Sequence, residues 1–119
     1  MEIPQLTETE LAPYLNQQEL IELTAQQLIK DFDLYGEKIT FSGNSDMAYA
    51  ELFKQIKPII TEAINKNFEK LLQLLYRIDV SEKRVRQSIT ENPDSASAIT
   101  RLIIYRELQK VIIRKNFAS

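Results

Sequence analysis

The sequence contains no cysteine and no histidine among its 119 residues. Without cysteine the chain forms no disulfide and has no thiolate to act as a nucleophile or metal ligand. Without histidine it lacks the commonest general base, the usual partner of a catalytic serine and the commonest transition-metal ligand. Most familiar active sites are thereby excluded, and we expect no catalytic residue, no metal site and no cofactor.

Glycine and proline are scarce, with 2 and 4 residues. So few turn-forming residues argue against many short strands and favour a few long helices. No run of about 18 uncharged apolar residues occurs, and the start of the sequence lacks the features of a secretory signal, so no membrane segment is expected. We expect a single helical domain over residues 1–119, located in the cytoplasm.

Charge is unevenly distributed along the sequence, although the net charge is only −2. Residues 1–60 hold 10 acidic and 4 basic residues, net −6, and residues 61–119 hold 7 acidic and 11 basic residues, net +4. Such asymmetry indicates either two segments that pack against each other or a basic surface that binds a polyanion.

Apolar periodicity and capping residues predict an all-α bundle of about four helices. Asn16 precedes a Gln-Gln-Glu segment that resembles a capping box, Gly36 is a typical helix end, and Asn92-Pro93 is a typical helix start. The predicted helices cover residues 17–34, 46–78, 82–91 and 93–116, with loops at 1–15 and 37–45.

The predicted helix 46–78 contains Pro58, which has no amide donor and clashes with the preceding turn. We expect the helix to be kinked or broken near Pro58, with residues 65–67 as a second weak point. The last helix is apolar on two sides, with Leu108 on one face and Leu102 on the other. This pattern is typical of a helix that packs between neighbours or crosses a subunit interface.

Basic residues provide the clearest candidate surface. Three of them recur at intervals of four on the last helix, and three more cluster on the helix before it. The candidate anion-binding or partner-binding residues are Lys83, Arg84, Arg86, Arg106, Lys110 and Arg114. The two helices also have the spacing of a helix-turn-helix. The alternative is that these cations flank apolar stripes and pair with the acidic first half.

Carboxylates are the remaining groups for acid–base chemistry. Glu19, Glu22 and Asp33 share a helix face, but this face lies opposite the apolar stripe, where solvated acids belong. Asp79 is most simply a helix cap beside Arg77, and the sharper alternative is a buried Arg77–Asp79 pair at a functional groove.

Residues 67–83 and 103–110 resemble a group of short uncharacterised helical bacterial proteins. The resemblance covers about the last half of the chain and implies no activity, ligand or functional residue. It leaves open whether the acidic first 45 residues are an added element.

These observations predict a non-enzymatic protein-interaction or assembly module that binds a second copy of itself or another protein. The alternative is a nucleic-acid-binding regulator that uses the basic surface. A carboxylate or metal-dependent enzyme is the third hypothesis, and it requires acids that converge in a pocket.

Overall fold

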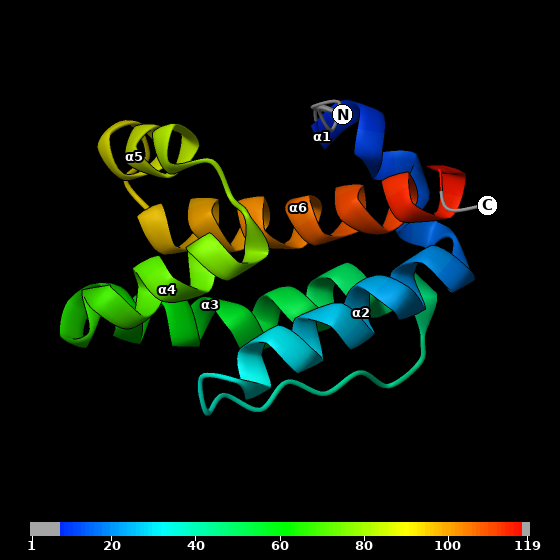
Figure 1. The fold of residues 1–119 in the computed structure, drawn as a ribbon, viewed down its shortest axis with the longest axis horizontal. Coiled ribbons are helices and arrows are strands. Elements are labelled where there is room, and N and C mark those ends of the chain that lie inside the picture. The colour runs from blue at the N-terminus through cyan, green and yellow to red at the C-terminus, as the bar shows by residue number, and fades with distance from the viewer. Residues whose placement is uncertain (1–7, 118–119) are drawn as a thin grey trace.

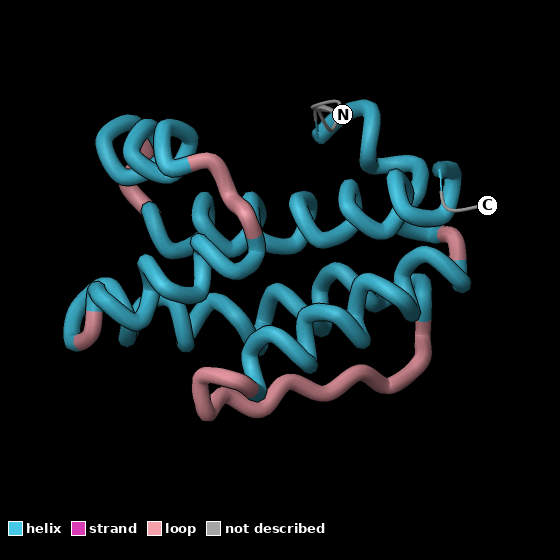
Figure 2. Tube along the Cα trace, in the orientation of Figure 1, coloured by secondary structure: helices cyan, strands magenta, loops and turns pink. Residues whose placement is uncertain are grey.

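The computed structural model describes residues 8–117, and all regular structure in this range is helical (Figures 1 and 2). The elements are α1 (Glu8–Leu11), the 3-10 helix η1 (Ala12–Asn16), α2 (Gln18–Asp33), the 3-10 helix η2 (Ser45–Met47), α3 (Ala48–Lys66), α4 (Phe68–Ile78), α5 (Glu82–Glu91) and α6 (Ser95–Phe117). The predicted all-α bundle is confirmed.

Helix α6 crosses the molecule and contacts α1, α2, α3, α4 and α5 (Figure 1). Ile99, Ile103 and Ile104 are fully buried in the main core, where α2, α3 and α4 supply most of the other side chains. Burying each such side chain stabilises the fold by about 1.5–3 kcal/mol. The two apolar sides of α6 therefore pack against neighbouring helices of the same chain. This was one of the two roles that the sequence pattern predicted for them.

A second, smaller core lies where α1 and η1 cover the end of α6. Leu11 is 2% exposed and packs with Leu20 and Leu108. The predicted loop over residues 1–15 is therefore wrong for its described part, and residues 1–7 lie outside the described range. The helical turns form because Leu11 gains a buried site and Pro13 is tolerated in the first turn of η1.

Residues 37–44 form the predicted loop and run in extended conformation. Ile39 is buried, and the backbone of Thr40 exchanges hydrogen bonds with the Gln55 side chain at 2.8 and 2.9 Å. The Glu51 carboxylate accepts from the Ser42 amide and hydroxyl at 2.8 and 2.7 Å. These contacts fasten the loop along α3.

The predicted helix 46–78 is divided, but not at Pro58. Helix α3 continues through Pro58 to Lys66, and the break falls at Asn67, whose backbone is non-helical at φ −152° and ψ 70°. The Asn67 side chain accepts a hydrogen bond from the Lys70 amide, which caps α4. The chain then turns back, so that α4 packs against α3 and buries Leu71 and Ile78 in the main core. The predicted break at Pro58 is therefore wrong, and the break falls instead within residues 65–67, the second weak point that the sequence predicted.

Replacing Asn67 by alanine should lower the free energy of unfolding by about 1 kcal/mol, because the first turn of α4 loses its side-chain cap. Urea denaturation monitored by circular dichroism measures the loss. The matched control is Asn65→Ala, which replaces an exposed residue inside α3 and should leave stability unchanged or slightly raised. Equal losses in both variants would contradict the capping role.

Helix α6 begins at Ser95, two residues later than Asn92-Pro93 predicted. Asp94, and not Asn92, faces its first turn: the Asp94 carboxylate accepts from the Ser97 amide at 3.1 Å and from the Ser97 hydroxyl at 2.7 Å. Lys57 of α3 adds an ion pair at 3.0 Å. The bonds from Ser97, assisted by Lys57, lower the pKa of Asp94 to about 2. Asp94 therefore stays ionised and joins the start of α6 to α3.

Candidate functional site

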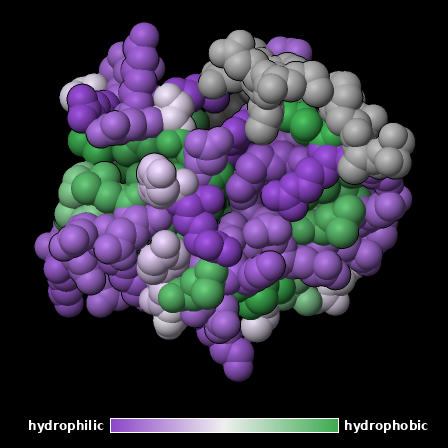
Figure 3. Space-filling view, in the orientation of Figure 1, coloured by the Kyte–Doolittle hydropathy of each residue, from purple (hydrophilic) through white to green (hydrophobic). Residues whose placement is uncertain are grey.

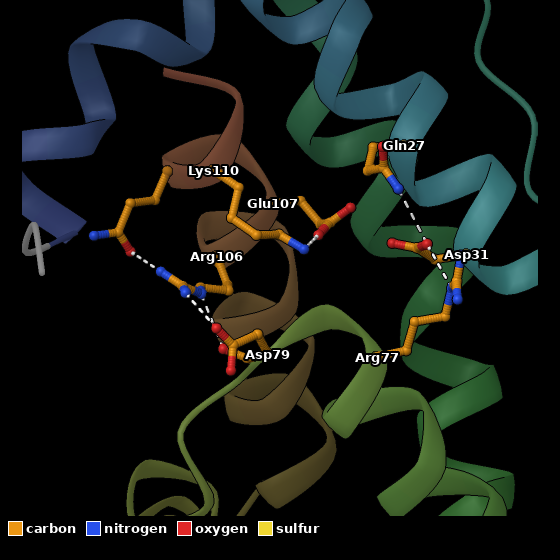
Figure 4. Close-up of polar contacts among 8 residues, drawn as sticks. Gln27, Asp31, Arg77, Asp79, Arg106, Glu107 and Lys110 are labelled. Atoms are coloured by element: carbon orange, nitrogen blue, oxygen red, sulfur yellow. Dashed lines mark hydrogen bonds and ion pairs between the residues drawn. The ribbon is translucent and has the colours of Figure 1, made fainter. Parts of the chain in front are cut away.

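The six basic residues singled out by the sequence do not form one surface. Arg106 donates to the Asp79 carboxylate at 2.7 Å, to the Asp79 carbonyl at 2.9 Å and to the Gln109 side chain at 3.1 Å (Figure 4). Lys110 forms an ion pair with Glu107. The side chains of Arg106 and Lys110 are only 15% and 14% exposed. Both cations are engaged inside the molecule.

The other four residues lie at two separate places. Lys83, Arg84 and Arg86 are exposed on α5, where Arg86 pairs with Glu82 at 2.8 Å. Arg114 is exposed near the far end of α6, beside α2. The structure therefore brings together only the three cations of α5.

Arg77 and Asp79 do not pair with each other, contrary to the sharper of the two sequence interpretations. Asp79 ends α4 in the left-handed conformation, with φ 68° and ψ 43°, and bonds to Arg106. Arg77 instead donates to Asp31 of α2 at 3.0 Å. Asp79 is the C-cap residue of α4, and Ser81 rather than Asp79 caps the start of α5.

A polar cluster lies between α2, α4 and α6, and we call it the buried carboxyl cluster. It consists of Gln27, Asp31, Arg77, Glu107 and Lys110. Asp31 Oδ1 accepts from Gln27 at 3.1 Å and from Arg77 at 3.0 Å, whereas Asp31 Oδ2 receives no hydrogen bond from any described residue. The Asp31 and Glu107 carboxyl groups point toward one another, and Lys110 lies on the other side of Glu107 (Figure 4).

The pKa of Glu107 is raised to about 7, primarily by burial; the nearby Lys110 opposes this shift, and the neighbouring Asp31 adds to it. The Glu107 residue has no exposed surface and Asp31 is 2% exposed. Both carboxyl groups lie buried between α2 and α6, so this cluster joins these helices and is closed to a substrate. Sequence analysis missed both acids. Their burial is suggested in the sequence by their neighbours, because Asp31 precedes Phe32 and Glu107 precedes Leu108, and both neighbours are fully buried.

The described surface contains one line of large apolar side chains, which we call the α4 stripe. It consists of Phe68, Leu72 and Tyr76, which are 45%, 45% and 88% exposed. Residues four apart lie on one helix face, so the three side chains extend over about 12 Å. The adjacent face of α4 is buried in the main core through Leu71 and Leu75. The sequence pattern alone did not identify this exposed line.

Other apolar surface is scattered. On the face shown in Figure 3, the green areas are separated from one another by purple polar side chains, and the most extended one lies at the upper left. Isolated exposed apolar residues are normal in folded proteins. The α4 stripe differs because its three members are aligned and adjacent.

Within residues 8–117, no group of three or more acidic side chains is placed to hold a metal ion. Every helix in this range is too short or too polar to cross a membrane. The exposed acids Glu19, Glu22 and Asp33 lie on the polar side of α2, as the amphipathic pattern predicted. These carboxylates are therefore ordinary surface charges.

The geometry defines an all-helical bundle with one exposed apolar line and a buried carboxyl cluster. Comparison with family models, curated proteins and solved structures finds no match to this chain.

Proposed function

We propose that this protein is a non-enzymatic interaction module that docks through the α4 stripe into an apolar groove of another protein. The main support for this proposal is the exposure of Tyr76. Its side chain is 88% exposed and in line with Phe68 and Leu72. Tyrosine and phenylalanine are typical anchors of helix-in-groove complexes, and a spacing of four residues is the arrangement in which such anchors occur.

The size of the stripe favours a groove over a second copy of the chain. From the exposed fractions of its residues, the stripe offers on the order of 300–400 Å². Two stripes packed face to face would bury about 700 Å², less than the roughly 1,200 Å² of specific complexes. A groove can also cover the exposed polar residues Glu69 and Gln73 that flank the stripe on α4, which adds to the buried area.

The distribution of apolar surface inside the bundle also supports α4 as the docking helix. The apolar faces of α6, which first suggested an interaction role, are covered by α1 to α5. The carboxyl groups of Asp31 and Glu107 in the buried carboxyl cluster are closed to solvent. The aligned apolar side chains of the α4 stripe, by contrast, are not covered by any described part of the chain.

A photocrosslinking amino acid at position 76, introduced in the native cell, should yield a discrete adduct with another protein. Leu72→Glu in the same chain should abolish the adduct, because a carboxylate in an apolar groove is costly to desolvate. The control carries the crosslinker at Lys54, an exposed residue of α3 outside the α4 stripe, and should yield none. Adducts of equal yield at both positions, or none at position 76, would overturn the proposal.

A further inference from the structure

A groove runs between α2 and the last turns of α6. Glu19 and Lys115 form an ion pair at one end, and Lys30 and Arg114 contribute to the lining. The two helices run in opposite directions here, so the start of α2 lies beside the end of α6 (Figure 1). The groove shares no residue with the α4 stripe.

The groove has an apolar floor. Leu23 from α2 is 40% exposed and faces the same space as Val111 from α6, which is 5% exposed. Val111 belongs to the second core, so this floor is held rigidly by Leu20 and Leu108 beneath it. An apolar side chain placed on Leu23 would cover exposed apolar surface on both helices.

The rim is basic in a protein of net negative charge. Lys30, Arg114 and Lys115 with Glu19 give the groove a net charge of +2, whereas the whole chain carries −2. Lys30 and Arg114 are exposed and form no ion pair with any described residue. Lys115 is paired with Glu19, but both side chains are well exposed, and such a pair is held weakly. All three cations are therefore able to accept a new anionic partner.

We propose that this groove binds an acidic segment of a partner protein, with carboxylates on Lys30 and Arg114 and an apolar side chain on Leu23. Alternation of acidic and apolar residues matches the alternation of rim and floor. A nucleic acid fits less well, because it carries a phosphate at every nucleotide and Glu19 and Glu22 would repel some of them, whereas a peptide can place uncharged residues opposite these two acids. Electrostatic complementarity of this kind governs which partner associates and how fast.

The test uses a fluorescently labelled helical peptide of about three turns that contains glutamate and leucine. The peptide should bind the intact protein, and affinity should fall when glutamines replace its glutamates and when salt is raised. The double variant Lys30→Glu/Arg114→Glu should weaken binding at least about tenfold, which corresponds to about 1.4 kcal/mol. The matched control Lys54→Glu/Lys66→Glu reverses two exposed lysines of α3 and should bind as the unmodified protein does.

Nuclear magnetic resonance of the unmodified protein gives a readout that needs no variant. Peptide addition should shift amide signals in residues 19–30 and 111–115 and leave the α4 stripe unchanged. The proposal is overturned if the acidic peptide does not bind, if the glutamine peptide binds equally, or if the shifts fall outside the groove. It is also overturned if an oligonucleotide binds more tightly than the peptide and loses affinity in the same double variant. Loss of the α4 crosslink has no bearing on these results, because the two surfaces are separate.

Discussion

Replacing Glu107 by glutamine should remove a decline in stability that the unmodified protein shows as the pH rises toward 7. In the folded state the pKa of Glu107 is raised from 4.5 to about 7, primarily by burial. The folded protein therefore binds more protons than the unfolded chain between these values, and its free energy of unfolding falls as the pH rises through this window. Above about pH 7 the decline ends.

The size of this effect follows from the shift in pKa. A raised pKa of this extent corresponds to roughly 3 kcal/mol between pH 4.5 and pH 7. Glutamine carries no charge at any pH in this window, so the variant should show almost none of this decline. Urea denaturation at a series of pH values from 4.5 to above 7 measures both curves.

Glu62→Gln is the matched control, because Glu62 is an exposed carboxylate on α3 outside the buried carboxyl cluster. This variant should retain the full decline. The role of Glu107 is refuted if Glu107→Gln and the unmodified protein lose the same free energy across the window. A direct titration of the Glu107 carboxyl carbon by nuclear magnetic resonance provides an independent measurement.

Leu71→Ala should lower the free energy of unfolding by about 2–5 kcal/mol, because Leu71 is fully buried and alanine leaves a cavity in a packed core. Helix α4 reaches this position only because the chain turns back at Asn67. Since folded domains have about 5–15 kcal/mol of stability in total, the variant should unfold at a much lower urea concentration.

The neighbouring substitution Leu72→Ala is an unusually close control. It removes the same atoms from the same helix, but Leu72 is 45% exposed in the α4 stripe. Its loss should be well below that of Leu71→Ala, within about 1 kcal/mol. If the two variants were equally destabilised, α4 would have to be buried on both sides, and the α4 stripe would not be a free surface.

The sequence shows which residues could form the candidate surfaces, but it does not show which of them are exposed. The spacing of Phe68, Leu72 and Tyr76 is visible in the printed residues, but the same spacing occurs in side chains that neighbouring helices cover. Likewise, the basic residues of α6 look alike in sequence, yet Arg106 is bonded to Asp79, 27 residues away, while Arg114 lies exposed on a groove. Exposure depends on the partner helix, which local pattern does not specify.

The sequence by itself determined the helical class, the extent of α2 and α5 to within a residue, and the loop before α3. These features depend on periodicity and capping within a few neighbouring residues, so local physical chemistry suffices. Between the two weak points that the sequence offered, Pro58 and residues 65–67, tertiary structure decided for the second. It also decided that Leu11 anchors helical turns near the start, and that Arg77 pairs with Asp31, 46 residues away. Those outcomes depend on which side chains meet across helices, because the energy of a buried apolar contact or charge is set by its distant neighbours.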